Sequence, residues 1–109
     1  MELAFEDRRL REICESEEYA QLNLGGEVAG YLKRRLADMR AALAVRDLVA
    51  GNPREIAGPI TTLIAVDLCD GYRIVFCANH VSNPTKEDGG MDWARVSRVR
   101  ILRIEVGDD

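Results

Sequence analysis

The apolar residues of this chain change their spacing at Pro59, and this change most limits the folds that are open to it. Before Pro59, apolar side chains recur at steps of three and four, as on one face of an α-helix: Val28, Leu32, Leu36, Met39 and Leu43. After Pro59, the segment 60–68 is apolar and β-branched, and 72–78 resembles a returning strand beyond an Asp70-Gly71 turn. Helices followed by a run of strands predict an α+β domain.

The first 26 residues predict a short strand and a short helix. Leu3 and Phe5 alternate with their neighbours at the period of a strand. Asp7 is suited to cap a helix, whose apolar side follows at helical spacing as Leu10, Ile13 and Cys14. We interpret 16–26 as a connection that Gly25-Gly26 closes.

The last third predicts a mobile loop over 80–92 and a final strand over 93–106. That strand does not alternate cleanly, since Val99 and Ile101 share one face while the other face carries Leu102, Ile104 and Val106. Either both faces are partly covered, or a β-bulge shifts the register near Ile101. The predicted order is β-α-α-β-β-β in a single domain, 1–109.

Length and composition exclude several classes of protein. The 109 residues suffice for one hydrophobic core, and no apolar stretch is long enough to cross a membrane. The charged N-terminus lacks the apolar core of a signal peptide, so we expect a cytoplasmic location. A net charge of −4 argues against broad affinity for nucleic acid.

Cysteine and histidine content argues against a metal or another cofactor. The chain has one His and three Cys without CxxC spacing, so we expect no metal site. Buried thiols are the favoured state of the cysteines, although a disulfide between Cys69 and Cys77 across the hairpin stays open.

The hairpin 70–76 carries the one specific motif, Asp-Gly-Tyr-Arg-Ile-Val-Phe. It resembles the G-[YW]-R-[IL]-x-[FY] stretch of the RelE, HigB and ParE toxins of bacterial type II toxin–antitoxin systems, and HigB-like killer proteins in particular. The resemblance implies a curved antiparallel sheet packed on two helices. It also implies neutralisation by a cognate antitoxin protein. Toxins of this family cleave mRNA on the ribosome without a metal ion or, in the ParE branch, inhibit DNA gyrase.

The motif and its surroundings supply the candidate site residues. Arg73 falls on the arginine of the motif, which implies a catalytic role in binding the scissile phosphate; alternatively it pairs with Asp67 or Asp70 across the hairpin. His80 is the candidate for proton transfer, with a surface loop position as the alternative. Tyr72 is suited to stack on an RNA base or to pack against the helices.

Arginines of the last strand are the other candidates for binding RNA. On a regular strand Arg98 and Arg100 point one way and Arg95 and Arg103 the other, so only a bulge would bring all of them to one groove. The alternative is that some of these arginines bind the acidic N-terminal helix or a partner protein.

Two departures from the family weaken the catalytic hypothesis. The apolar Ile64 and Val66 stand where RelE-like nucleases carry Lys, and the chain ends in acids (Glu105, Asp108 and Asp109) where the family places basic residues or a Tyr-His pair. Two hypotheses therefore stay open. One is a ribosome-dependent mRNA endoribonuclease with ribosome and mRNA as partners. The other is a non-catalytic protein-binding module, either a gyrase-type blocker or an inactive relative that binds an antitoxin. The sequence does not decide whether the chain is an enzyme.

Overall fold

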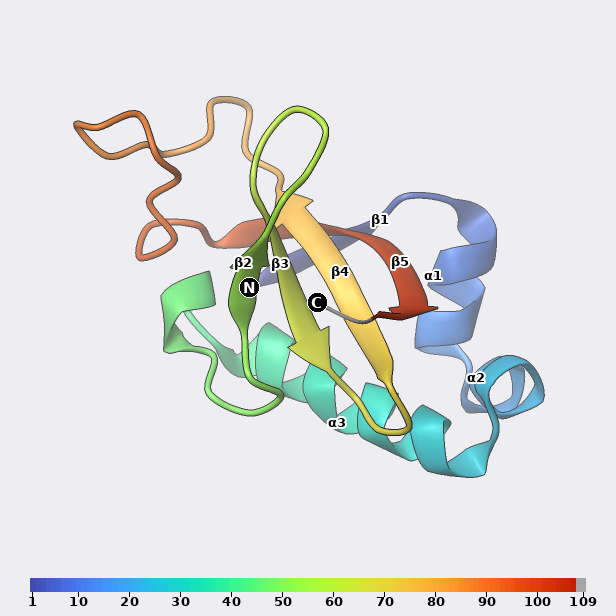
Figure 1. Cartoon of the computed structure of the whole chain (residues 1–109). Coiled ribbons are helices and arrows are strands. Elements are labelled where there is room, and N and C mark those ends of the chain that lie inside the picture. Colours follow the sequence, from blue (N-terminus) through green and yellow to red (C-terminus); the bar gives the residue numbers. More distant parts are fainter. Residues whose placement is uncertain (108–109) are drawn as a thin grey trace.

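The structure is a computed structural model, and it describes residues 1–107. Within these residues the chain folds into three α-helices and a five-stranded mixed sheet (Figure 1). The elements in chain order are β1 (Glu2–Phe5), α1 (Arg8–Glu15), α2 (Glu17–Leu24), α3 (Gly26–Ala41), the 3₁₀ turn η1 (Val45–Asp47), β2 (Arg54–Ile56), β3 (Leu63–Asp67), β4 (Tyr72–Ala78) and β5 (Arg98–Val106). The predicted α+β class is confirmed.

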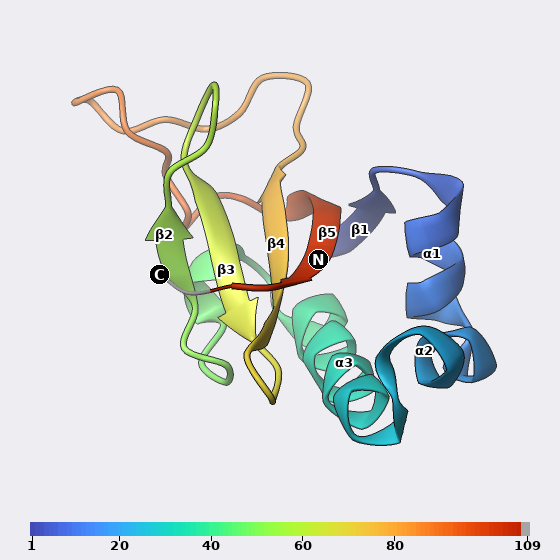
Figure 2. The ribbon, with the colours of Figure 1, turned by 45° about the vertical axis from the view of Figure 1, so that its right-hand side comes forward.

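The strand order in the sheet is β1-β5-β4-β3-β2. β1 runs parallel to β5, and the other neighbouring strands are antiparallel. The expectation of a wholly antiparallel sheet is therefore wrong at the β1 edge. Figure 2 shows α3 beneath the strands, with α1 and α2 beyond the edge that β1 and β5 form.

The predicted order β-α-α-β-β-β lacks one helix and one strand. Segment 16–26 was expected to be a connection, but most of it forms α2. Ser16 ends α1 with its backbone N–H and starts α2 with its hydroxyl, which accepts the N–H of Tyr19 at 3.3 Å. Ala20 is the buried residue of α2, so the sequence of this helix shows no series of apolar residues at helical spacing by which it could be predicted.

The missed strand is β2, which pairs with the first part of β3. Its three residues are too few for a recognisable alternation. The strand expected over 60–68 is also shorter, since β3 begins at Leu63 and Ile60 is almost fully exposed. The segment between β2 and β3 turns sharply next to Gly58, where an added Cβ would lie 2.2 Å from the carbonyl oxygen of Thr61.

Both predicted helices are present, with one changed end. The carboxylate of Asp7 accepts the N–H of Leu10 at 2.8 Å and caps α1 as expected. α3 ends at Ala41, so Leu43, which was expected on its buried face, is exposed. The remaining apolar positions of the α3 stripe are buried: Val28, Leu32, Leu36 and Met39.

The hydrophobic core lies between these helices and one face of the sheet. The strand residues in this core alternate along β3, β4 and β5: Ile64, Val66, Ile74, Phe76, Val99 and Ile101. Because successive residues of a strand point to opposite faces, the residues between them lie on the face away from the helices. That second face carries the arginines on which the functional hypotheses depend.

A β-bulge interrupts the pairing of β4 with β5. Val75 pairs with Arg103 and Phe76 pairs with Ile101, so Leu102 is the extra residue. Of the two alternatives that the sequence left open, the register shift near Ile101 is present, although the strand begins at Arg98 rather than at 93. The bulge reverses the alternation of β5 beyond it.

The segment 79–92 projects from the sheet and contains its own turn (Figure 1). Thr85 and Met91 form an isolated bridge, and the N–H of Lys86 donates to the carbonyl of Gly90 at 2.7 Å. The expected mobility of this loop stays a prediction. No helix within residues 1–107 combines the length and apolar composition that crossing a bilayer requires.

Candidate functional site

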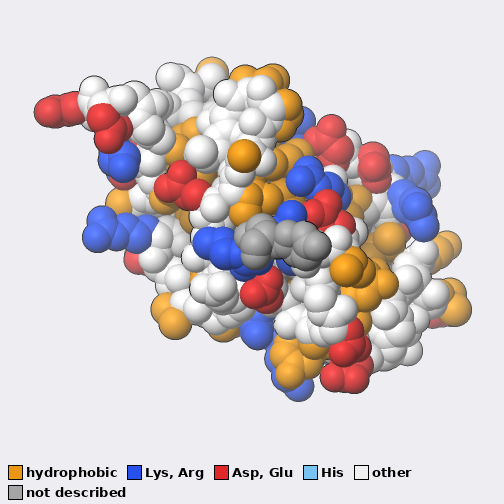
Figure 3. Space-filling model, viewed as in Figure 1, with side chains coloured by type: hydrophobic (Ala, Val, Ile, Leu, Met, Phe, Trp, Pro, Cys, Tyr) orange, Lys and Arg blue, Asp and Glu red, His pale blue; other side chains and the backbone are white. Residues whose placement is uncertain are grey.

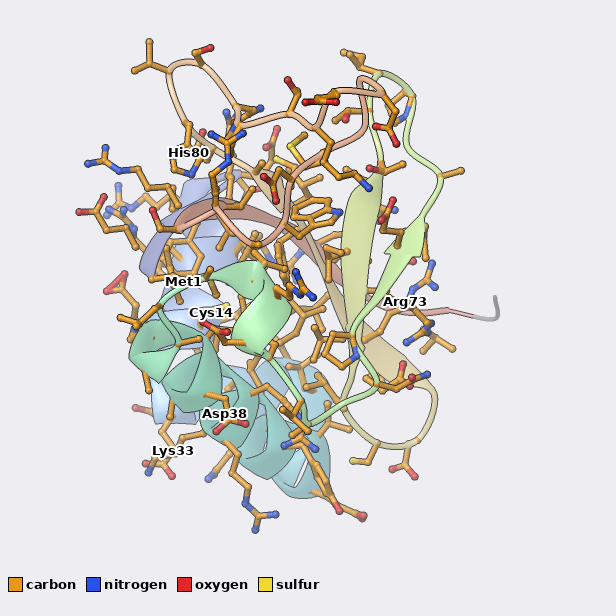
Figure 4. The ribbon with its side chains drawn as sticks, turned by 90° about the vertical axis from the view of Figure 1, so that its left-hand side faces the viewer. Met1, Cys14, Lys33, Asp38, Arg73 and His80 are labelled. Carbon is orange, nitrogen blue, oxygen red and sulfur yellow. The ribbon has the colours of Figure 1, made fainter. Side chains whose placement is uncertain are left out.

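Arg73 projects from the face of the sheet that lies away from the helices. In β4 the side chains of Ile74 and Phe76 enter the core, and Arg73, Val75 and Cys77 therefore point to the other side. Figure 4 shows Arg73 on this side of the strands, with α3 on the opposite side. The resemblance implied this orientation, since a phosphate-binding arginine would face the concave surface.

Arg73 is held there by a carboxylate. Its Nη2 and Nε atoms both donate to Oε2 of Glu105, at 2.7 and 3.0 Å. The side chain of Arg73 is only 11% exposed and that of Glu105 is 28% exposed. Arg73 therefore forms an ion pair, but the partner that the structure shows is Glu105 on β5 and not Asp67 or Asp70, which the alternative named.

Glu105 is bound by two guanidinium groups. Its second oxygen, Oε1, accepts a hydrogen bond from Nε of Arg103. Burial raises the pKa of Glu105, but the hydrogen bonds from Arg73 and Arg103 outweigh this effect and lower the pKa below its ordinary value. Glu105 is therefore charged at neutral pH and occupies the position between two arginines that a substrate phosphate would need.

The backbone of Gly107 lies against the guanidinium of Arg73. A Cβ added at Gly107 would lie 2.1 Å from Nε and 2.4 Å from Cζ of Arg73. Asp108 and Asp109, the terminal acids that we expected to repel a phosphate, lie outside the described residues. Gly107 thus leaves no room above Arg73 for a side chain at this position.

The β-bulge places three further groups on the face of Arg73. Arg103 and Glu105 pair with Val75 and Arg73, and Arg100 pairs with Cys77, so all of them share one face. Without the extra residue Leu102, Arg103 would lie on the opposite face from Arg100. The bulge that the sequence left open therefore decides that the arginines of β5 line one surface.

The arginines of β5 on this face, Arg98, Arg100 and Arg103, form a row in which each has a carboxylate partner. Nε of Arg98 lies 3.3 Å from Oε2 of Glu2 in β1, and Nη1 of Arg100 lies 3.6 Å from Oε2 of Glu6, the residue after β1. Farther along the sheet, Arg54 pairs with Asp67 at 3.1 Å. Figure 3 shows basic and acidic side chains next to each other on this side of the molecule. These acids largely neutralise the row and leave it without the strong positive potential that would attract a polynucleotide.

The centre of this face is filled rather than hollow. Val75 and Ala65 point to the same side as Arg73, and both are fully buried. These two residues are therefore not exposed to a nucleotide on this face.

Tyr72 and His80 do not join Arg73 in one site. Tyr72 precedes Arg73 on the strand, faces the helices and packs against the core, so the packing alternative holds for it. His80 follows the other end of β4, and at about 3.3 Å per residue the Cα atoms of Arg73 and Ala78 alone are about 16 Å apart. Figure 4 shows His80 and Arg73 well separated.

His80 has a structural contact instead. Its ring atom Nε2 accepts the backbone N–H of Ser97 at 3.1 Å, and the backbone N–H of His80 donates to Oδ1 of Asn83 at 2.9 Å. The imidazole therefore ties the start of the 79–92 loop to the chain just before β5.

One group of potential metal ligands occurs within residues 1–107. Glu27 at the start of α3 and Cys69 and Asp70 in the β3–β4 turn have ligand atoms within 4.8 Å of one another. Both carboxylates are exposed, and exposed acids gather often without an ion, so the group carries no assignment. Cys14, Cys69 and Cys77 are free thiols, which excludes the Cys69–Cys77 disulfide in this structure.

Comparisons with protein-family models, with curated proteins and with solved structures find no match to this chain. What the protein does must therefore be inferred from its own side chains.

The residue of the candidate site that the sequence did not identify is Glu105. We expected acids at the end of the chain to repel a phosphate, whereas this one binds the candidate catalytic arginine. The available signal was the Arg103-x-Glu105 spacing, which places the two side chains on one face of a strand. Its meaning depended on the register of β5 against β4, which the bulge sets.

Proposed function

We propose that this chain is a toxin-like component of a bacterial type II toxin–antitoxin system that acts by binding protein and not by cutting RNA. The observation that carries the proposal is the ion pair of Arg73 with Glu105. An arginine that stabilises a scissile phosphate must be able to donate to it, and here the same N–H groups donate to a carboxylate of the chain itself.

The surroundings of Arg73 support the same conclusion. A phosphate that approached Arg73 would be repelled by the negative charge of Glu105, which already accepts the hydrogen bonds of the guanidinium. His80, the candidate for proton transfer, is beyond the far end of β4 and bound to the backbone of Ser97, and the carboxylate beside Arg73, that of Glu105, is held by two guanidinium groups. What the resemblance leaves for the chain is binding of a cognate antitoxin or of a target such as gyrase.

The ribosome-dependent endoribonuclease is the second candidate. One observation favours it, since the bulge brings Arg103 to the same face as Arg98 and Arg100, which is also the face of Arg73. Neutralisation by Glu2, Glu6 and Glu105 counts against it.

Induced expression in a bacterial host separates the two candidates. Growth is followed after induction, and total mRNA is mapped by primer extension. We expect no new cleavage sites from the wild-type chain. The variants Arg73→Ala and Arg73→Ala/Glu105→Ala should leave any growth arrest unchanged, and the double variant controls for an unpaired charge that would unfold the protein. Ribosome-dependent cleavage that disappears in both folded variants would overturn the proposal.

Partner binding is tested directly with the reading frames that flank the gene. Each is co-expressed with the tagged chain, and the purified material is analysed by light scattering after gel filtration. A stable complex of defined stoichiometry with one neighbour is the expected result. A chain that elutes free of every flanking product contradicts the antitoxin part of the proposal.

A further inference from the structure

The C-terminal half of β5 has an open edge. β1 pairs only with Arg98–Ile101, and its pairing ends where the N–H of Glu6 donates to the carbonyl of Ile101 at 2.8 Å. From there the chain turns away into α1. Among the described residues, none adds a strand to 102–106 on the side opposite to β4.

The backbone of this half presents regular hydrogen-bonding groups to the open side. The N–H of Gly107 donates to the carbonyl of Gly71 at 3.0 Å, so the backbone groups of Gly107 face β4. In an antiparallel pair these groups alternate, and Glu105 therefore also faces β4 while Ile104 and Val106 turn their N–H and C=O groups outward. A strand added at this edge can form backbone hydrogen bonds with these two residues, because every second residue of an edge strand offers its N–H and C=O groups to a new neighbour.

A groove with apolar walls runs beside this edge. It has a volume of about 250 Å³ and lies between β5 and the pair of helices α1 and α2. Its apolar lining is formed by Leu10, Ile13, Leu24, Leu102 and Ile104. Its charged lining residues are Arg9, Arg103 and Asp7; the carboxylate of Asp7 caps α1, and Arg9 donates to the side chain of Asn23 at 3.1 Å.

We infer that this edge and groove bind an extended segment of a partner protein, which pairs with 102–106 as a sixth strand. This inference rests on the proposed protein-binding function and names the surface that performs it. The segment has apolar side chains at alternate positions that enter the groove, because successive residues of a strand point to opposite sides. An acidic residue in the segment complements Arg9.

The shape of the site selects an extended segment over other occupants. A helix laid along this edge has no free backbone groups in its interior to satisfy those of Ile104 and Val106. A second copy of this chain would bring its own α1 and α2 against the helices that already stand beside the edge (Figure 2).

A displayed library of random 12-residue peptides supplies the probe. Peptides selected on the full chain are resynthesised and titrated, and hydrogen exchange of the backbone amides is followed by NMR. We expect the selected peptides to share apolar residues at alternate positions and to slow exchange at Ile104 and Val106 at least tenfold. No enrichment, or protection confined to other amides, would overturn the inference.

A proline variant tests the backbone contact. Val106 is 66% exposed, and proline at an edge position removes only the outward N–H. Val106→Pro should weaken peptide binding at least tenfold relative to the matched control Val106→Ala, which loses the same methyl groups but keeps the N–H. Equal affinities would contradict strand pairing. If Val106→Pro fails to fold, the exchange measurement on the wild-type chain decides alone.

The outcomes separate this inference from the proposed function. A flanking gene product that binds Val106→Pro as tightly as Val106→Ala would leave the protein-binding function intact and refute the edge as its site. A concentration-dependent dimer that protects Ile104 and Val106 without any peptide would assign the edge to a second copy and refute the inferred occupant. Peptide binding at the edge without any binding of flanking products would instead contradict the antitoxin proposal alone.

Discussion

The guanidinium of Arg73 on β4 and the carboxylate of Glu105 on β5 lie directly opposite each other, with Nη2 and Oε2 2.7 Å apart. This pair joins the two central elements of the functional hypotheses, the hairpin motif and the acidic end of the chain. Because both side chains are mostly covered, the pair fixes the C-terminal half of β5 against β4 as well as occupying the arginine.

Removing the carboxylate should destabilise the protein. Glu105→Gln leaves two guanidinium groups with weaker acceptors, and we expect a loss of about 1 to 3 kcal/mol in the free energy of unfolding. The control Asp67→Asn breaks the more exposed pair with Arg54, and its cost should stay below about 1 kcal/mol. Urea denaturation measures both losses. Equal losses would show that the pair of Arg73 with Glu105 stabilises the fold no more than the exposed pair of Arg54 with Asp67.

The same carboxylate should contribute to acid sensitivity. Its pKa is lowered in the folded state from the ordinary value of 4.5. The stability it contributes is therefore complete above about pH 4.5 and disappears as the pH falls through the lower folded pKa. Wild-type protein should lose more stability than Glu105→Gln on going from about pH 5 to about pH 3. Parallel curves for the two proteins over this range would contradict the assignment.

A side chain at Gly107 should displace Arg73. We expect Gly107→Ala to cost about 1 kcal/mol in the wild-type background and much less when Arg73 is already Ala. The reason is that the added Cβ collides with the guanidinium, 2.1 Å from Nε. A double-mutant cycle by urea denaturation measures the coupling, and full additivity would mean that the two residues are not in contact.

Cys14 should resist thiol reagents. Burial raises the pKa of its thiol from 9.0 to about 12, which lowers its thiolate fraction at neutral pH by about a thousandfold. Alkylation with iodoacetamide at about pH 8, followed by mass spectrometry, should leave Cys14 unmodified in the native protein and modify it readily in urea. Fast native labelling of Cys14 would show that α1 opens from the core.

His80 should act through its hydrogen bond to Ser97. His80→Ala removes the acceptor of the Ser97 N–H, so we expect faster hydrogen exchange at that amide and a loss of about 1 kcal/mol in stability. Growth effects on expression should not change, since we assign the ring a structural contact and no part in catalysis. A variant with native stability but altered toxicity would return His80 to the list of functional residues.

The sequence determined the parts of this fold whose information is local. The α3 stripe, the Asp7 cap and the Asp70-Gly71 hairpin all follow from periodicity and turn chemistry, and each is present. Even the bulge near Ile101 was visible as a break in the alternation of the last strand. The helix α2 was missed because only Ala20 is buried in it, and β2 because it has three residues.

Only the tertiary structure decided what the arginines do. The motif identified Arg73, but its partner is a residue 32 positions away whose register depends on one extra residue, Leu102. A pattern of residue types shows which face of a strand a side chain occupies and does not show which strand lies beside it. The charge on Arg73 was therefore predictable from the sequence. Its neutralisation by Glu105 was not, because an ion pair requires two groups to meet in space and only the folded chain brings them together.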